Sequence, residues 1–453
     1  MDIDRRRLIA ISALTGAVPA ATLAAPAAAA PRPALGIDAT QLGVRAGNGA
    51  EQTNMLQNAI DQAAGARVPL VLGPGEYRTG ELRLPAGAQL IGVRGATRLI
   101  FTGGAAMISA RGAGHITLAG LVLDGGGKPM PEGSALVQIM QSNDVRIVDC
   151  EIVKSSRNGI SLHVVEGTVS GNTIAGVEDA AILSRDARGL TIQGNVVRSA
   201  GNNGILVWRS DKGDDGTIVA DNRIEDIANK RGGSGQFGNG INVFRAANVM
   251  VRGNRITRAA FSAVRGNAAS NLQVVNNTAT DIGEVALYAE FGFEGAVISN
   301  NTVDGAAFGI SVTNFNEGGR LAVVQGNLIR NLRSKRPAGT DPKDSAGVGI
   351  GVEADAAVTG NVIENAPKTG ISVGWGHHMR DVSVVGNVVR SAAYGITVSV
   401  ASGAGTAVIA GNLIAGASRG AIVGMEFASA VTGDLIKEPA RFANLQISGN
   451  RVR

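Results

Sequence analysis

The sequence predicts an all-β protein, a single right-handed parallel β-helix of about 12–14 coils with a short N-terminal capping helix. Three observations support this fold class. A Gly-Asn-x-Ile motif returns along most of the chain, short runs of alternating apolar residues separate its copies, and no helical period appears after about residue 65. The 64 glycines suit an ordered, turn-rich protein because Val and Ile recur at regular spacing among them.

The motif sets the repeat length. Its asparagines stand at intervals of 23, 27, 32, 23, 24, 26, 34, 26, 25 and 38 residues, beginning with Asn172 and ending with Asn450. Intervals that stay close to the minimum, with a few longer ones, are typical of a structural repeat that carries loop insertions. Propeller blades are nearly twice as long, and the leucine framework of leucine-rich repeats is absent. One coil with three short strands and three corners fits the interval.

The motif asparagines are interpreted as scaffold. We expect Gly-Asn to form a corner at which the asparagine adopts a left-handed backbone, and the stacked side-chain amides to bond from coil to coil. The following Ile or Val then points into the core. The segment VDCEI at 148–152 looks like a degenerate first copy, so its Cys150 is expected to be a buried core residue.

The N-terminal part divides into a signal and a cap. Residues 1–30 are predicted to be a twin-arginine translocation (Tat) signal, since arginines at 5–7 precede a short, alanine-rich apolar run. That run is too short and too weakly apolar for a good membrane anchor. The β-helix domain, 31–453, is therefore expected to be periplasmic or secreted, with the Tat machinery as its export partner and no stable membrane span.

The capping helix is expected just after residue 52. Thr53 or Asn54 can cap it, and its apolar stripe consists of Met55, Leu56, Ala59, Ile60 and Ala63. Such a helix would cover the open edge of the first coil, which could otherwise pair with other chains.

These features resemble a known group. The cap helix, the segment PLVLGPGEYRTGELRLPAGAQLIG at 69–92 and the asparagine-punctuated coils resemble the pectate-lyase-like superfamily of right-handed parallel β-helix proteins. The Arg-Arg signal joined to such repeats is similar to a family of twin-arginine-translocated repeat proteins. The resemblance implies polysaccharide lyases, glycoside hydrolases, epimerases or non-catalytic proteins. The Asn-Thr-Asp, Asp-Asp and Gly-His-Gly pattern of polygalacturonases is not found in this sequence.

Residues that the scaffold does not explain gather just after the Gly-Ile strand of successive coils. Aligning the coils on that strand places on one strip the candidate substrate-binding residues Trp208, Arg209, Arg245, Asn267, Asn314 and Asp355 and the candidate catalytic residues Arg265, Tyr288, Glu290 and Glu353. Two insertions, 229–239 and 333–346, should emerge at one corner about 19 Å apart along the axis. With their Lys and Arg side chains they are expected to form the walls of an open cleft for an acidic polysaccharide.

Two chemistries remain open for this cleft. A lyase would use Arg245 or Arg265 to stabilise a uronate carboxylate and Tyr288 as the base. A hydrolase would use Glu290 and Glu353 as a carboxyl pair about 9–10 Å apart. The sequence does not distinguish an epimerase from these two enzyme classes. The alternative is a non-catalytic glycan-binding or envelope-associated protein.

Other partners are not indicated. The formal net charge of +5 is small for this length, and no nucleic-acid module is found, so nucleic acid is not expected as a partner. His377 and His378 are adjacent and on a strand would point to opposite faces, so we expect no metal site and no cofactor.

Overall fold

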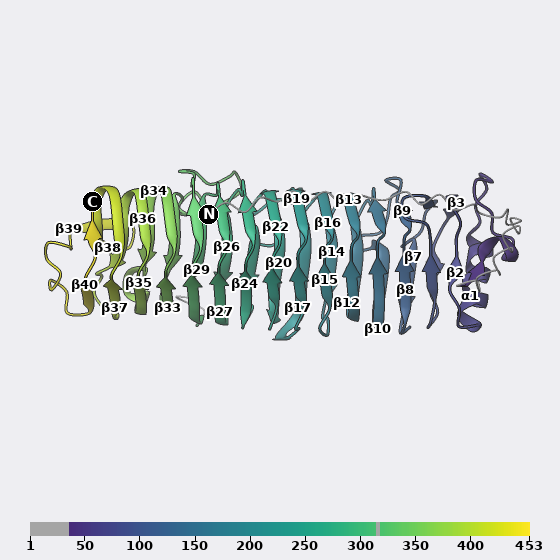
Figure 1. The fold of residues 1–453 in the computed structure, drawn as a ribbon, viewed down its shortest axis with the longest axis horizontal. Coiled ribbons are helices and arrows are strands. Elements are labelled where there is room, and N and C mark those ends of the chain that lie inside the picture. Colours follow the sequence, from purple (N-terminus) through teal and green to yellow (C-terminus); the bar gives the residue numbers. More distant parts are fainter. Residues whose placement is uncertain (1–35, 314–317) are drawn as a thin grey trace, which may run out of the picture. The chain divides into compact units, whose positions relative to one another are not determined.

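Parallel strands stack from coil to coil along one axis, in the order of the sequence (Figure 1). The computed structural model describes residues 36–313 and 318–453, so the predicted signal at 1–30 lies outside the described residues. About 14 parallel turns follow one short helix, which confirms the predicted architecture. Each turn contributes strands to three faces, which we call faces A, B and C, and five long strands bend around a corner from one face to the next.

Face A contains the Gly-Ile strands of the repeat. Its members pair in parallel in the order β4 (Leu82–Arg83), β7 (Ile108–Arg111), β10 (Ala135–Val148), β12 (Asn158–Ser170), β14 (Ala180–Arg185), β17 (Asn203–Asp214), β20 (Asn239–Ala247), β23 (Val264–Asn267), β26 (Val285–Glu290), β29 (Phe308–Thr313), β32 (Val348–Val352), β34 (Val362–Val373), β36 (Val388–Ser399) and β38 (Leu413–Glu426).

Face B precedes the Gly-Asn corner. Besides the second halves of β10 and β12, it comprises β1 (Ile37–Asp38), β2 (Leu70–Val71), β5 (Gln89–Ile91), β8 (Ile116–Ala119), β15 (Thr191–Gln193), β18 (Ile218–Ala220), β21 (Met250–Arg252), β24 (Leu272–Val275), β27 (Glu294–Ser299), β30 (Arg320–Gln325), β33 (Ala354–Thr359), β35 (Arg380–Val385), β37 (Ala407–Ala410) and β40 (Leu445–Ser448).

Face C follows that corner. Besides the first halves of β34, β36 and β38, it comprises β3 (Gly75–Thr79), β6 (Thr97–Phe101), β9 (Val122–Asp124), β11 (Glu151–Val153), β13 (Thr173–Val177), β16 (Val196–Ala200), β19 (Arg223–Ile227), β22 (Arg255–Ala259), β25 (Thr278–Thr280), β28 (Thr302–Asp304), β31 (Leu328–Arg330) and β41 (Arg451–Val452). The remaining strand, β39 (Ser429–Asp434), pairs antiparallel with β38.

The asparagine ladder is confirmed. The Nδ2 of Asn254 donates to the Oδ1 of Asn277 at 3.0 Å, and the Oδ1 of Asn254 accepts from the Nδ2 of Asn222 at 2.9 Å. The same contact joins each neighbouring pair from Asn172 to Asn450. At the start of the ladder the backbone N of Cys150 donates to Asn172, so the degenerate first copy takes its place in the stack. Burial raises the pKa of the Cys150 thiol to about 11.

The corner differs from the expectation in one respect. The left-handed backbone belongs to the residue before the ladder asparagine, such as Gly171 (φ 67°) or Gly253 (φ 65°), and not to the asparagine. Where glycine is missing, Asp221 and Asn276 take the same conformation, which short polar side chains tolerate. The motif glycine therefore makes the turn, and its asparagine is left to bond along the axis.

The capping helix is present as α1 (Thr53–Gly65). Leu56, Ala59, Ile60 and Ala63 are buried as predicted, but Met55 is exposed. The predicted cap is also wrong, because the N-cap is Gln52, which makes no capping hydrogen bond and bonds to the backbone of Arg45 instead. The helix packs against β2, β4 and β5 at the start of the stack.

The other short helices are η1 (Ala39–Leu42) and η2 (Gly376–His378). The second matters for the site. His377 and His378 were expected on a strand, facing opposite ways, but in this helix their ring centroids lie 4.0 Å apart.

Candidate glycan-binding groove

The predicted strip exists on face A, as two neighbouring rows of outward side chains. One row places Arg185, Trp208, Phe244, Asn267, Glu290 and Thr313 opposite one another in successive coils. The row beside it contains Asn242, Arg265, Tyr288, Ser311, Gly351, Ser372 and Thr397. The coil alignment from sequence therefore gave the correct neighbours for Arg265, Asn267, Tyr288 and Glu290.

Glu290 and Arg265 form a buried ion pair. The Nε and Nη2 of Arg265 donate to the two carboxylate oxygens of Glu290 at 2.7 and 2.8 Å, and Asn267 donates to the same carboxylate at 2.8 Å. The guanidinium lies 4.9 Å from the ring centroid of Tyr288. Arg265 is 8% exposed and Glu290 is 3% exposed, so the two charges neutralise each other away from solvent.

The ion pair extends into a larger charge cluster. Glu284 lies 3.9 Å from the other amino group of Arg265 and accepts a 2.7 Å hydrogen bond from Arg336 of the second insertion. Burial raises the pKa of the Glu284 carboxyl against the opposing effect of both arginines. Burial also raises the pKa of Tyr288, with the Glu290 carboxylate adding to it. A phenol with a raised pKa stays protonated at neutral pH, so this geometry does not favour Tyr288 as a base.

The two insertions do not stand apart as walls of a cleft. Both emerge at the corner between faces C and A, as predicted, but both lie against the buried ring of Phe261. A Cβ on Gly238 would lie 2.4 Å from that ring, and one on Gly339 would lie 3.7 Å from it. The insertions therefore converge over the Arg265 coil and bury it.

Most of the Lys and Arg side chains that were expected to attract an acidic glycan form ion pairs with carboxylates of the coils on which the insertions lie. Lys230 pairs with Glu178, and Arg231 pairs with Asp179. Arg333 pairs with Asp281, and Arg336 bonds to Glu284. The attraction of these side chains for a distant anion is reduced accordingly, because each has a carboxylate within contact distance.

A groove of about 370 Å³ lies on face A beyond the second insertion, toward the C-terminus. Its floor is the outward row from Tyr288 through Ser311, Gly351 and Ser372 to Thr397, four coil steps or about 19 Å along the axis. A side chain on Gly351 would meet the ring of Phe308 at 2.7 Å. The ring of Phe308 therefore covers Gly351, and the floor beyond it consists of the small side chains Ser311, Ser372 and Thr397.

The second insertion lines one side of this groove, and the turns after the face A strands line the other. Lys343, Asp344 and Ser345 belong to the first side, while Glu353 and Trp375 belong to the second. Among the predicted catalytic residues, Tyr288 and Glu353 therefore line the groove. Glu290 and Arg265 lie behind its N-terminal end in the buried cluster.

An aromatic pair stands at the C-terminal end of the groove. The rings of Trp375 and Phe427 meet edge to face with centroids 5.7 Å apart, although Trp375 is 38% and Phe427 44% exposed. Phe427 also has a left-handed backbone, with φ 51°, and a side chain on Gly376 would clash with its ring at 2.2 Å. Exposed aromatic rings fixed beside polar side chains are typical of ligand-binding grooves.

Lys368 is the cation best placed in this groove. Its Nζ donates to the Oγ of Ser345 at 2.7 Å, which joins β34 to the second insertion. Burial lowers the pKa of Lys368. Sequence reasoning missed Lys368 and Phe427. An aromatic residue at a turn where polar residues or glycine are usual was a signal for Phe427, whereas nothing in APKTGISV singles out Lys368.

The remaining predicted residues lie elsewhere. Trp208 packs edge to face on Phe244, 6.3 Å between centroids, on the N-terminal side of the insertions. Arg245 lies over the Phe244 ring, and its Nη1 donates to the backbone of Ser210 at 3.2 Å. Arg209 donates to the backbone oxygens of Ala187 and Asp211. Asn314 lies outside the described residues.

Asp355 does not share a surface with Glu353, contrary to the predicted strip. The chain turns the corner within one residue, since β32 ends at Val352 and β33 begins at Ala354. Asp355 is thereby carried to face B, where its carboxylate binds Arg380 at 2.8 Å. Within the described residues, no group of three or more His, Cys, Asp and Glu side chains is placed to hold a metal ion.

Comparison with known proteins agrees with the fold. The model of the right-handed β-helix region matches residues 97–224, 158–329 and 213–389 in overlapping segments, so the chain belongs to this family. No curated protein matches the sequence. Among the described residues, no helix is both long and apolar enough to cross a membrane.

Solved structures share the fold at low sequence identity. The catalytic unit of a GH87 α-1,3-glucanase from Streptomyces thermodiastaticus strain HF3-3 has a TM-score of 0.57 and 17% identity, covering 94% of this chain and 70% of that one. PfbA, a surface adhesin of Streptococcus pneumoniae, has a TM-score of 0.51 and 12% identity, covering 87% of this chain and 94% of that one. At such identities the likeness concerns the fold alone, which an enzyme and an adhesin share.

Proposed function

We propose that the protein is exported and that its face A groove binds an extended acidic polysaccharide, which the protein cleaves or modifies. The observation that carries this proposal is that one groove combines the exposed Trp375–Phe427 pair at its C-terminal end with Lys343 and Lys368 along one side. Aromatic rings offer a flat apolar surface to a sugar ring, and the lysines complement uronate carboxylates. A glucanase with the same fold shows that such a scaffold can support polysaccharide chemistry.

The groove also contains groups for proton transfer. Asp344 and Glu353 are carboxyls on its two sides, and Tyr288 at one end is a phenol that stays protonated. A carboxyl and a phenol of this kind can act as base and acid on a bound sugar. Glu290 is less suited, because both of its oxygens accept hydrogen bonds from Arg265. A lyase, a hydrolase and an epimerase all remain compatible with these groups.

A non-catalytic glycan-binding protein is the second candidate. It is favoured by the position of Glu290, the carboxylate that sequence reasoning placed at the centre of the strip, within a buried ion pair. The two candidates differ in whether bound glycan is consumed. Incubation with uronate-containing glycans separates them, because elimination raises absorbance near 235 nm and hydrolysis releases reducing ends.

The binding proposal predicts a specific mutational pattern. Trp375→Ala should weaken the binding of a hexagalacturonate by about 10-fold or more, and Lys368→Met by several-fold, as measured by calorimetric titration. Trp208→Ala is the matched control. Trp208 lies six coil steps, or about 29 Å, from Trp375, so a hexamer held in the groove should bind this variant normally. Equal effects of both tryptophan changes would contradict the location of the site.

Export can be tested separately. The double change Arg5→Lys and Arg6→Lys should leave the protein in the cytoplasm, because the Tat machinery reads the paired arginines. Cell fractionation of the variant beside the native protein provides the measurement. Normal export of the double variant would remove the proposed route.

A further inference from the structure

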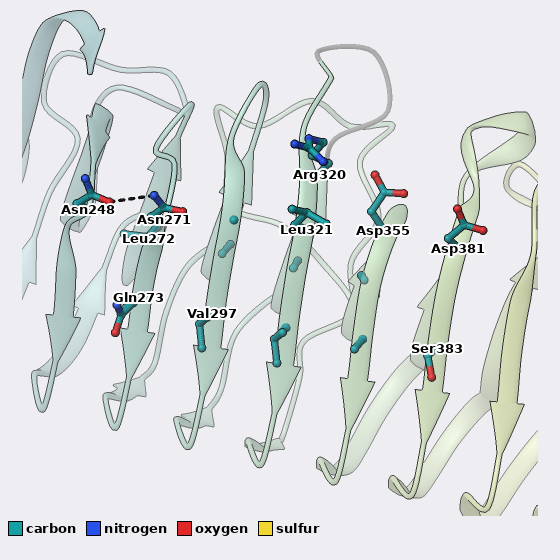
Figure 2. A pocket seen from close by; sticks show the side chains of 16 residues that line it. Asn248, Asn271, Leu272, Gln273, Val297, Arg320, Leu321, Asp355, Asp381 and Ser383 are labelled. Atoms are coloured by element: carbon teal, nitrogen blue, oxygen red, sulfur yellow. Dashed lines mark hydrogen bonds between the residues drawn. The ribbon is translucent and has the colours of Figure 1, made fainter. Parts of the chain in front are cut away.

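The outer surface of face B carries a second groove that the proposed function does not use. It has a volume of about 930 Å³ and crosses β24, β27, β30, β33 and β35. Figure 2 shows its labelled side chains along these strands and at the corner where the strands begin. It therefore lies on a different face from the Trp375–Phe427 groove.

The floor of this second groove is an outward apolar row. Val297 and Val323 are each 38% exposed and stand beside Ala357 in the next coil, with Gln273 and Ser383 at the two ends. The row covers four coil steps, about 19 Å. The same row holds Ile218 and Met250 in the two coils before Gln273, and it is polar in the coils before those, with Arg146, Thr168 and Thr191 opposite one another. An apolar floor on a solvent-facing strand surface is typical of a binding surface.

One side of the second groove is a corner at which every coil has a left-handed residue. Most of the positions hold residues that tolerate this backbone, namely Asn248, Asn271, Gly295, Asp355 and Asp381. Leu321 occupies the remaining position with φ 64° and is 51% exposed. Leucine is unfavourable at this position for two reasons, because a left-handed backbone is strained for it and because its apolar side chain is exposed to water. A ligand that covers its side chain would offset the second of these effects.

The polar rim of the second groove carries little net charge. Asp355 is neutralised by Arg380, and Arg320 pairs with Glu294 (Figure 2 shows Asp355 and Arg320). Asp381 accepts a hydrogen bond from the hydroxyl of Thr406. The rim thus presents carboxylate and amide oxygens that accept hydrogen bonds from hydroxyl groups, and no cationic surplus that would attract an anion.

We propose that this groove binds a neutral polysaccharide, with its chain along the axis of the coils and about one sugar ring for each coil. Pyranose rings have apolar C–H faces that match the Val297–Val323–Ala357 floor and hydroxyl edges that match the rim. An extended chain advances by a distance similar to the coil spacing of about 4.8 Å.

The test uses the full mature protein and defined neutral probes. Cellohexaose, laminarihexaose, maltohexaose and mannohexaose are titrated by calorimetry against the native protein and Val323→Asp. At least one probe should bind, and Val323→Asp should weaken that binding at least 10-fold. Val408→Asp is the matched control, because Val408 points outward in the same row but one coil beyond Ser383 and outside the groove. Failure of all four probes to bind, or equal binding to native and Val323→Asp, overturns the proposal.

A second variant separates ligand contact from stability. Leu321→Asn places at the corner a residue that tolerates the left-handed backbone. It should keep or raise the melting temperature and weaken binding of the same probe several-fold. Unchanged binding by this variant would contradict the role given to Leu321. The result is independent of the acidic-glycan proposal, since Val323→Asp should leave hexagalacturonate binding unchanged and Trp375→Ala should leave the neutral probe unaffected.

Discussion

Replacing Arg265 with methionine is expected to lower the free energy of unfolding by about 3–5 kcal/mol, a larger loss than we expect from breaking any other ion pair in the described residues. The change leaves the Glu290 carboxylate, 3% exposed, without its bidentate partner. It also removes one of the two arginines beside Glu284, whose carboxylate lies 3.9 Å from Arg265. A buried carboxylate that loses its counter-charge must either stay ionised at high cost or take up a proton. The measurement is the midpoint of urea unfolding, followed by circular dichroism.

Two further variants make this prediction specific. Arg258→Met removes an exposed arginine that binds Asp226 with two hydrogen bonds, and it should leave the midpoint nearly unchanged. The double variant Arg265→Met, Glu290→Leu removes both charges and should recover much of the lost stability. An Arg265→Met protein as stable as the native one would contradict the structural role of the pair. If enzymatic activity is found, Glu290→Gln should lower the free energy of unfolding, and its effect on turnover should be the smaller of the two.

The second large effect is expected in the asparagine ladder. Asn254→Ala should lower the free energy of unfolding by roughly 1–3 kcal/mol, because the backbone N–H and the side-chain amide of Asn222 both lose their acceptor. The carbonyl oxygen of Val219 loses a donor as well. Asn450→Ala is the matched control, since Asn450 is the last member of the ladder and only partly buried, and its effect should be smaller. Identical melting of native and Asn254→Ala protein would contradict the ladder.

The fold could be predicted from the sequence because its determinants are local and repeated. From Asn172 onward each coil places an asparagine in the same position, followed by an inward Ile or Val in every coil except those of Asn277 and Asn450, so an alignment error in one coil does not shift the next. The predicted neighbours Arg265–Tyr288 and Asn267–Glu290 follow from that regularity. The placement of the turn was wrong by one residue, since the sequence pattern Gly-Asn does not say which of the two residues has the left-handed backbone.

The candidate site could be predicted only where the coil repeat is regular. Asp355 was assigned to the wrong face because the corner at Glu353 is a single residue long, whereas β26 and β27 are separated by three residues. The insertions contain no repeat, so their contact with Phe261 and the pairing of Arg336 with Glu284 depend on tertiary packing. Lys368 joins the groove through Ser345 of such an insertion, and no local pattern reveals that contact.

The central claim is that the face A groove between Tyr288 and Phe427 binds an acidic glycan. It is tested most directly by a crystal structure of the protein with bound hexagalacturonate. The claim predicts sugar rings over the Ser311–Thr397 floor, with one ring against Trp375 or Phe427 and a carboxylate within hydrogen-bond distance of Lys368 or Lys343. A hexamer bound on face B, or on the N-terminal side of the insertions beside Trp208, would contradict it.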